Sequence, residues 1–281
     1  MLDKISLGTA QFGLEYGINN NKGQTRRDEV SKILKRCKKA GIMHIDTAAA
    51  YGSAENVLGE VIQSERLSDS FHITTKYKSD GINNLSLSTR ESLQKLRVKK
   101  LHCQMFHSYL DFKNTKDFIK PESVDKIGVS VYTNEELLDT LENFNVSVVQ
   151  CPFNLLDNDS IRGETLAKAK QKGIEIQVRS AFLQGLFFMD RNNLPPLLIE
   201  LKSYLKELDR ICSENQISMS HLALGYCLSK DYIDKVVIGV DSLEQLNLNI
   251  EAVKTPLPYS LIEEIDKIKV INQSLLSPTN W

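Results

Sequence analysis

Short runs of aliphatic and β-branched residues alternate with longer amphipathic stretches along the whole chain. The apolar runs predict eight strands, at residues 4–7, 43–46, 71–75, 101–106, 126–129, 147–151, 175–178 and 235–238. Several of these runs, such as VSVVQC, show no alternation of polar and apolar residues. That pattern is typical of parallel strands that are buried on both faces.

The amphipathic stretches between these runs have the spacing of helices. We expect helices at residues 27–40, 53–64, 86–96, 134–144, 161–171 and 244–252, with two more near 198–214 and 218–228. Val30, Ile33, Leu34 and Cys37 recur at helical spacing in the first of them, and Gly41 follows, where a residue free to take positive φ can end a helix.

Eight strands that alternate with helices, without a linker rich in Pro, Gly or Ser, predict an α/β fold: a (β/α)₈ TIM barrel. We expect one domain over residues 1–281, with an irregular tail after about residue 270. A doubly wound open sheet is the alternative architecture. Against it, no GxGxxG motif follows the first strand, where a dinucleotide-binding sheet would carry one.

Composition and charge narrow the class of protein. The chain has 281 residues, of which 41% are hydrophobic, and a formal net charge of −1. Without a basic patch we expect no nucleic-acid partner, and without an apolar run of roughly 20 residues we expect no membrane span. The five cysteines are scattered and form no CxxC pair, which favours reduced thiols and a cytoplasmic protein without a metal site. The oligomeric state is not predicted.

Four polar side chains follow successive strands of the predicted barrel. Asp46 ends the second strand, Tyr51 lies in the next loop, Lys76 follows the third strand and His107 follows the fourth. Each alone has an ordinary structural interpretation, as a turn residue, a loop aromatic, a solvated lysine or a structural histidine. Together they would share the C-terminal face of the barrel, where such folds place active sites, and a titratable cluster in one cavity is costly unless it is used.

The chemistry available to these four residues is general acid catalysis. A phenol ordinarily ionises near pH 10, and a neighbouring ammonium stabilises its anion. Asp46 can keep Lys76 charged through a charge-assisted hydrogen bond, and His107 can orient a substrate oxygen. The set therefore predicts an acid, Tyr51, directed at a carbonyl oxygen. None of the four is a nucleophile toward the carbonyl carbon, and a hydride from a bound cofactor would fill that role.

The segment from Asp46 to Gly59 reads DTAAAYGSAENVLG, and it resembles the D-T-A-x-x-Y-G-x-x-E-x-x-L-G signature of the aldo-keto reductases. The resemblance extends over nearly the whole chain, from LGTAQFG onward. It implies an NAD(P)H-dependent oxidoreductase that reduces an aldehyde or ketone to an alcohol. By resemblance, Tyr51 is the proton donor, Lys76 and Asp46 tune it, and His107 orients the carbonyl.

The same resemblance implies a set of cofactor-binding residues. Ser130 and Gln150 match positions that hold the nicotinamide carboxamide, although Val131 replaces the usual Asn after the serine. Arg179 stands where the family often has an aromatic stacked on the nicotinamide, and a planar guanidinium can also stack. The remaining positions match the pyrophosphate loops and the adenosine strip: Thr9, Ala10, Ser180, Phe182, Gln184, Gly185, Ile238, Gly239, Ser242, Gln245 and Asn249.

The nucleotide is expected to be NADP(H) on the resemblance alone, with NAD(H) as the alternative. Many relatives carry an Arg or Lys after the last strand for the 2′-phosphate, whereas this chain has Asp241, Ser242 and Leu243. An aspartate repels a phosphate. Ser242 is also expected to be the N-cap of the following helix, which is compatible with either nucleotide.

The substrate is expected to be a small carbonyl compound, and by resemblance a sugar-derived aldehyde or ketone. Aromatic residues after the strands could line its pocket, with Phe112, Phe153 and Phe182 among the candidates, whereas Phe188 is expected in the core. Two other functions stay open. Lys76 could form a Schiff base in a lyase or aldolase, although an Asp46 partner would keep it charged. The chain could also be a non-catalytic nicotinamide-binding module.

Overall fold

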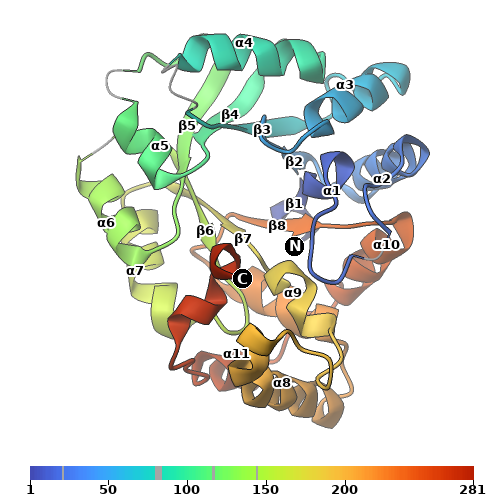
Figure 1. Ribbon diagram of the computed structural model, residues 1–281, viewed down its shortest axis with the longest axis vertical. Helices are drawn as coiled ribbons and strands as arrows, with labels where there is room; N and C mark the ends of the chain where they lie inside the picture. Colours follow the sequence, from blue (N-terminus) through green and yellow to red (C-terminus); the bar gives the residue numbers. More distant parts are fainter. Residues whose placement is uncertain (21, 80–83, 116–117, 144) are drawn as a thin grey trace.

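A closed ring of parallel strands forms the centre of the protein. The computed structural model describes residues 1–20, 22–79, 84–115, 118–143 and 145–281. Over these residues eight strands pair in chain order, and β1 pairs with both β2 and β8, which closes the barrel (Figure 1). The predicted (β/α)₈ barrel is confirmed and the open sheet is excluded. The strands are β1 (Ile5–Gly8), β2 (His44–Asp46), β3 (His72–Tyr77), β4 (Leu101–Phe106), β5 (Val124–Ser130), β6 (Val148–Pro152), β7 (Glu175–Arg179) and β8 (Lys235–Gly239).

The longer helices form the outer layer around this ring, as Figure 1 shows. In chain order the helices are α1 (Ala10–Gly13), α2 (Arg27–Ala40), α3 (Ala54–Ser64), α4 (Leu85–Leu96), α5 (Tyr109–Asn114), α6 (Asn134–Asn143), α7 (Asp159–Gln171), α8 (Lys202–Glu214), α9 (Met219–Ser229), α10 (Leu243–Ala252) and α11 (Tyr259–Asp266). Short 3₁₀ turns occur at Leu2–Lys4, Leu183–Phe188, Pro196–Leu201, Gln273–Leu276 and Pro278–Asn280.

The helix α2 shows why the apolar spacing predicts these elements. Its buried residues are the four expected ones, Val30, Ile33, Leu34 and Cys37. The helix ends at Gly41, which has φ of 79° and donates its backbone N–H to the last turn. This is the left-handed conformation that glycine adopts at low cost. The apolar stripe packs against the barrel, and each such side chain contributes about 1.5–3 kcal/mol by leaving water.

Some boundaries differ from the sequence-based expectation, and caps explain two of them. The structure starts α4 one residue early because the Asn84 side chain accepts from the N–H of Leu87. It starts α7 at Asp159 because Asn158 caps it through Ser160 N–H. Three helices, α1, α5 and α11, were not predicted, since all three are short. The helix expected over 134–144 is α6, and residue 144 lies outside the described residues.

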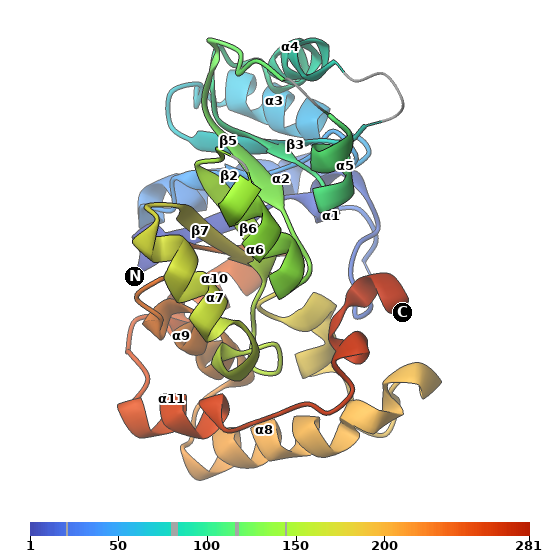
Figure 2. The same ribbon diagram turned by 90° about the vertical axis from the view of Figure 1, so that its left-hand side faces the viewer.

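The two chain ends lie on opposite sides of the barrel in Figure 2. The C-terminal segment lies on the side of α1 and α5, which directly follow β1 and β4, so it belongs to the face where the strands end. Within the part of the chain that the structure describes, no helix has the length and apolar character needed to cross a bilayer.

Three histidines gather at the opposite end, where the strands begin. The rings of His44, His72 and His102 have centroids 4.9–5.6 Å apart. Burial, followed by the charge of Lys235, lowers the pKa of His44 to about 3. Glu175 faces this cluster, with its Oε2 3.6 Å from His102 Nε2.

Candidate active site

The four residues expected to carry chemistry meet at the end of the barrel where β2, β3 and β4 finish. Asp46 is the last residue of β2, Tyr51 lies in the loop before α3, and His107 directly follows β4. Lys76 lies inside β3 rather than after it, because the strand continues to Tyr77, two residues past the predicted end. Its side chain therefore leaves the strand within the barrel wall and is only 1% exposed.

Lys76 and Asp46 form a buried ion pair. The Nζ of Lys76 donates to Asp46 Oδ1 and also donates to the phenol oxygen of Tyr51 over 3.4 Å. Burial acts to lower the pKa of Lys76, but the Asp46 carboxylate and the hydrogen bonds to Asp46 and Tyr51 outweigh it and raise this pKa above its ordinary value. Lys76 is therefore a fixed ammonium behind the phenol.

Gln150 connects this ion pair to the far wall of the barrel. Its Nε2 donates to Asp46 Oδ2 over 2.8 Å and to Gln177 Oε1 over 3.2 Å. Its Oε1 is buried and has no hydrogen-bond partner among the described residues. A buried amide oxygen without a partner is costly, so it is suited to accept from a bound ligand.

His107 lies edge-on to the phenol. The ring centroids of Tyr51 and His107 are 5.7 Å apart and their planes meet at 86°. Burial, followed by the charge of Lys76, lowers the pKa of His107 to about 4. The imidazole is therefore neutral at pH 7, and its buried Nδ1 has no partner in the described part of the chain.

Two glycines fix the loop that carries Tyr51. A Cβ on Gly13 would lie 1.9 Å from the Tyr51 carbonyl oxygen, and a Cβ on Gly52 would lie 2.4 Å from the Gly13 carbonyl oxygen. Gly52 also has φ of 54°, where other residues are strained. The loops after β1 and β2 therefore touch through backbone that has no space for side chains.

Tyr51 lies on the wall of a cavity of about 440 Å³. The cavity extends from the ends of β1 and β2 across β7 and β8 to α10. Fourteen of the eighteen residues predicted for the site line it: Thr9, Ala10, Asp46, Tyr51, Gln150, Arg179, Ser180, Phe182, Gln184, Gly185, Ile238, Gly239, Gln245 and Asn249.

The other four predicted residues do not line this cavity. Lys76 lies behind its wall, and His107 lines a neighbouring pocket that also contains Leu110. Ser130, the last residue of β5, is 2% exposed. Ser242 caps α10, as expected, by accepting from the N–H of Gln245 over 3.3 Å.

A segment that sequence reasoning missed covers one side of the cavity. Tyr16, Gly17, Asn19 and Asn20 line it, and the Gln184 side chain donates to the Tyr16 hydroxyl over 3.2 Å. The signal was present in the sequence as a polar stretch, EYGINNNKGQ, between the first strand and the next long helix. Such a long connection on the catalytic face of a barrel often carries functional residues.

The phenylalanine residues that line the cavity are not the ones expected from the sequence, except for Phe182. Phe153 is fully buried and stacks on Tyr226, and Phe112 is 2% exposed and packs on Phe106, so neither reaches the cavity. Phe188, expected in the core, is 43% exposed and lines the cavity beside Phe182. The 3₁₀ segment Leu183–Phe188 turns Phe187 inward and Phe188 outward.

This 3₁₀ segment has an unusual backbone. Ser180, Leu183 and Gln184 all have positive φ, between 46° and 62°, and Gly185 follows with φ of 93°. Non-glycine residues in this region cost about 1–3 kcal/mol each, and such strain concentrates at ligand-binding segments. The segment bends tightly around the cavity, and the N–H of Ile18 donates to the Gln184 carbonyl oxygen.

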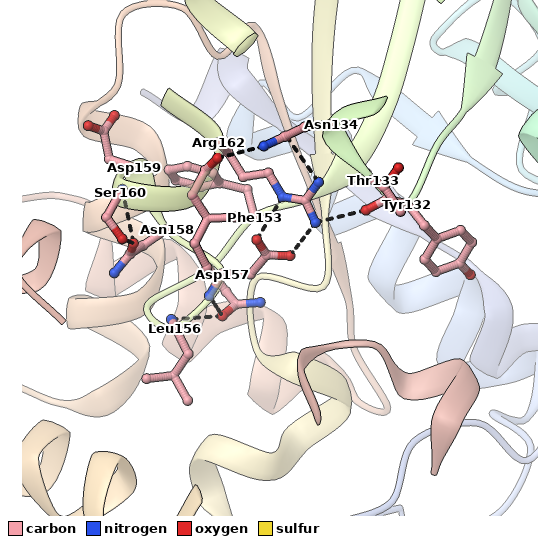
Figure 3. A network of polar contacts seen from close by, with 12 residues as sticks. Tyr132, Thr133, Asn134, Phe153, Leu156, Asp157, Asn158, Asp159, Ser160 and Arg162 are labelled. Carbon is pink, nitrogen blue, oxygen red and sulfur yellow. Dashed lines mark hydrogen bonds and ion pairs between the residues drawn. The ribbon is translucent and has the colours of Figure 1, made fainter. Parts of the chain in front are cut away.

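The guanidinium of Arg179 places a positive charge at the cavity wall. Its guanidinium carbon lies 4.2 Å from the centroid of the Tyr132 ring, and its Nη2 is 3.5 Å from the Val131 carbonyl oxygen. Figure 3 shows how Tyr132 is anchored: Arg162 pairs with Asp157 through two contacts of 2.7 and 2.9 Å and donates to the Tyr132 carbonyl oxygen over 2.8 Å. A buried ion pair therefore fixes the backbone of the residue on which Arg179 stacks.

The residues around the cavity fit a nicotinamide dinucleotide. The unpartnered Oε1 of Gln150 offers an acceptor for a carboxamide N–H beside Tyr51. At the other end the Gln11 side chain packs directly on the backbone of Gly239, since a Cβ there would lie 2.4 Å from it, and both residues line the cavity. Gln150, Thr9 and Arg179 would hold the nicotinamide half, and the segment 180–185 with the start of α10 would hold the remainder.

Both the sequence and the fold of this chain are similar to those of known proteins. Residues 4–270 match the model of the Aldo/keto reductase family. The chain is 25% identical to an L-galactose dehydrogenase of Arabidopsis thaliana, over 89% of this chain and 83% of that protein. It is 22% identical to a probable voltage-gated potassium channel subunit beta of Oryza sativa subsp. japonica, over 88% of each chain.

A further relative and a solved structure are also similar to this chain. The chain is 23% identical to an L-glyceraldehyde 3-phosphate reductase of Escherichia coli (strain K12), over 85% of this chain and 83% of that protein. The fold matches the aldo-keto reductase AKR11C1 from Bacillus halodurans, in its holo form, with a TM-score of 0.71 and 20% identity over 95% of this chain and 92% of that one. At this identity the structural match concerns the fold.

Proposed function

The chain belongs to the aldo/keto reductase family, and from that premise we propose that it is an oxidoreductase that reduces an aldehyde or ketone to the alcohol, with Tyr51 as proton donor. The observation that carries the proposal is the hydrogen bonding of one buried ammonium, Lys76, to both Asp46 and the Tyr51 phenol at the cavity wall. A bound nicotinamide dinucleotide, NADH or NADPH, would supply the hydride to the carbonyl carbon.

The residues of the site would then transfer the proton and stabilise the charges that develop. As the carbonyl double bond becomes a single bond, its oxygen gains negative charge and takes the proton from Tyr51 Oη. The Lys76 ammonium stabilises the phenolate that is left, and Asp46 keeps that ammonium in place. His107, neutral at pH 7, provides a ring nitrogen beside the phenol that can orient the substrate oxygen.

The unpartnered oxygen of Gln150 supports the placement of the nicotinamide at this end of the cavity. Ser130, at the end of the neighbouring β5, pairs in register with Gln150 and would hold the carboxamide with it. The substrate would enter between Tyr51 and the apolar, aromatic pair Phe182 and Phe188, and by family resemblance it would be a small, sugar-derived carbonyl compound.

The two other functions are less well supported. A Schiff-base lysine must be neutral to attack, whereas Asp46 raises the pKa of Lys76. The sequence likeness to a potassium channel β subunit makes a nicotinamide-binding module the second candidate. A pure binder has no need for a buried ammonium behind a phenol, so catalysis is the better account of the site.

Turnover of a panel of aldehydes and ketones, followed by the loss of reduced nicotinamide absorbance, tests the proposal. We expect turnover with at least one nucleotide and alcohol as the product. Nucleotide binding without turnover of any carbonyl in the panel would favour the binding module. Trapping of a carbonyl substrate onto Lys76 by borohydride would overturn the reductase in favour of the lyase.

A further inference from the structure

The two ends of the cavity differ in the charge that they present, and this difference bears on which nucleotide is bound. The inference rests on the proposed function. Since the hydride donor must reach the same carbonyl as Tyr51, the nicotinamide lies at the Tyr51 end and the adenosine lies at the other. Gly8 pairs with both Asp46 and Gly239, so Gly239 lies two strands from Asp46, about 10 Å across the sheet. Beyond it, Asp241 and α10 form the adenosine end.

The adenosine end of the cavity presents a carboxylate and no cation. Asp241, Gln245, Leu248 and Asn249 line it. Among the described residues, Arg179 is the only Lys or Arg that lines the cavity, and it lies at the end of β7, stacked on Tyr132.

Asp241 is fixed by hydrogen bonds to Gln245, and one of its carboxylate oxygens has no partner among the described residues. Its Oδ2 accepts from Gln245 Nε2 over 3.2 Å, and its backbone N–H donates to Gln245 Oε1 over 2.8 Å. Its Oδ1 is buried and has no hydrogen-bond partner in the described part of the chain. A free acceptor of this kind matches a ribose hydroxyl, which donates, and repels a phosphate.

The N-terminus of α10 would otherwise attract an anion, but two of its backbone N–H groups, those of Leu243 and Gln245, already have partners. Glu29, from α2, accepts from the N–H of Leu243 over 2.7 Å, and Ser242 accepts from the N–H of Gln245. The hydrogen bond from Leu243 holds the pKa of Glu29 below its ordinary value, so this carboxylate stays charged at pH 7. A second carboxylate therefore lies at this helix end and accepts from one of the N–H groups that could otherwise bind an anion.

The cations around α10 are committed elsewhere. Lys32 pairs with Glu29 at 3.2 Å and with Asp28 at 3.8 Å, and Arg36 donates to Asn247 over 2.7 Å. Neither Lys32 nor Arg36 lines the cavity. A phosphate placed in the cavity here would meet the Asp241 carboxylate without a cation to offset it, and it carries a charge of roughly −1.5 to −2 at pH 7.

We propose that Asp241, supported by Glu29, makes this protein selective for NAD(H) over NADP(H) by accepting from the adenosine ribose hydroxyls. This differs from the NADP(H) expected from family resemblance. The residues that determine this nucleotide selectivity therefore lie at the start of α10 and not around Tyr51.

Isothermal titration calorimetry of the full chain with NADH and NADPH tests the proposal without reference to turnover. We expect NADH to bind at least about tenfold more tightly, the scale of one close charge pair near a protein surface. Asp241→Asn should narrow that ratio to about threefold or less, mostly by tightening NADPH. Glu244→Gln is the matched control: it removes a charge from the same helical turn at a residue that does not line the cavity, and should leave the ratio unchanged.

The outcomes separate this inference from the function on which it rests. Equal or tighter binding of NADPH by the unmodified chain overturns the selectivity and leaves the reductase intact. A ratio that changes as much in Glu244→Gln as in Asp241→Asn overturns the role of Asp241, because it shows an effect of overall charge. Failure of the folded protein to bind either nucleotide overturns the selectivity and the proposed function together.

Discussion

The Nζ of Lys76 lies 3.4 Å from the phenol oxygen of Tyr51 and donates to it from a side chain that is 1% exposed. The ammonium sits behind the phenol, and the phenol faces the cavity. The position of the charge is fixed by Asp46, which holds Lys76 from its other side. Tyr51 therefore lies between the buried ammonium and the cavity.

Replacing Tyr51 with Phe should lower kcat about 10²-fold or more, because the general acid is lost. The dissociation constant for reduced nicotinamide should stay within about twofold, since the ring remains. Steady-state kinetics and a binding titration on the same preparation measure both. Tyr16→Phe is the control, a second cavity tyrosine whose hydroxyl only accepts from Gln184. Full activity in Tyr51→Phe would remove Tyr51 from the mechanism.

Lys76→Met should reduce kcat at least as much as Tyr51→Phe, because nothing then stabilises the phenolate. Asp46→Asn should have a smaller effect on kcat, since the ammonium is retained. It should lower the free energy of unfolding by about 3 kcal/mol, however, because it leaves a buried charge without its counter-ion. Kinetics and urea unfolding measure the two effects. A stable Asp46→Asn protein would mean that water reaches Lys76.

The rate should not respond to protonation of His107 near neutral pH. Its pKa is about 4, lowered first by burial and then by the charge of Lys76. The ring therefore stays neutral from pH 8 down to about pH 5, and kcat in the reductive direction should be level over that range. A pH profile of kcat checks this, with His107→Gln as the comparison. A fall in kcat centred near pH 6.5, absent from His107→Gln, would show an ordinary imidazole.

Stability should fall in mild acid because of His44. Its folded pKa, about 3, lies below the value of about 6.5 for an unfolded chain. The unfolded state thus binds more protons below pH 6.5, and the stability present above that pH is lost as the pH falls toward 3. Between pH 7 and pH 5 this histidine should cost about 2 kcal/mol of unfolding free energy.

Urea unfolding of the unmodified chain and of His44→Gln at both pH values isolates that effect. The glutamine variant should lose about 2 kcal/mol less between pH 7 and pH 5. Equal losses in the two proteins would show that His44 titrates alike in the folded and unfolded states.

The ion pair between Arg162 and Asp157 should stabilise the fold and also affect binding at the site. Asp157→Asn leaves Arg162, which is 8% exposed, without its carboxylate and should lower the unfolding free energy by about 3 kcal/mol. Because Arg162 also holds the Tyr132 carbonyl oxygen, KM should rise through the displaced Arg179. Glu164→Gln, in the exposed pair with Lys168, should leave both measurements unchanged. Equal effects of the two substitutions would contradict this role.

The barrel was predictable from sequence because its signals are local and repeated. Each strand is a short apolar run, and α2 shows its buried stripe and its terminal Gly41 in the sequence itself. The short helices α5 and α11 escaped prediction, since α5 spans only Tyr109–Asn114 and depends on a cap from Ser108. The end of β3 was misplaced because a lysine is expected to be exposed unless its partner is known, and here the partner is Asp46 on the neighbouring strand β2.

The site residues that follow strands could be placed from the sequence because the ends of the strands could be predicted. Asp46, Tyr51 and Gln150 reach the cavity from three different loops or strands because parallel strands end at one face. The contribution of Tyr16 and the outward turn of Phe188 depend on how the segment 183–188 bends, with Gln184 at a φ of 53°. No spacing rule contains that information, since non-glycine residues rarely adopt this backbone.

The contact between Gly13 and Gly52 has a consequence for how this protein can be recombined with its relatives. Each glycine leaves space for the backbone of the other loop, down to 1.9 Å from the Tyr51 carbonyl oxygen for an added Cβ. The first and second βα loops therefore form one exchangeable block. A chimera that takes its second loop from a relative must take the first loop from the same parent, or the backbone contacts between Gly13 and the loop that carries Tyr51 will be lost.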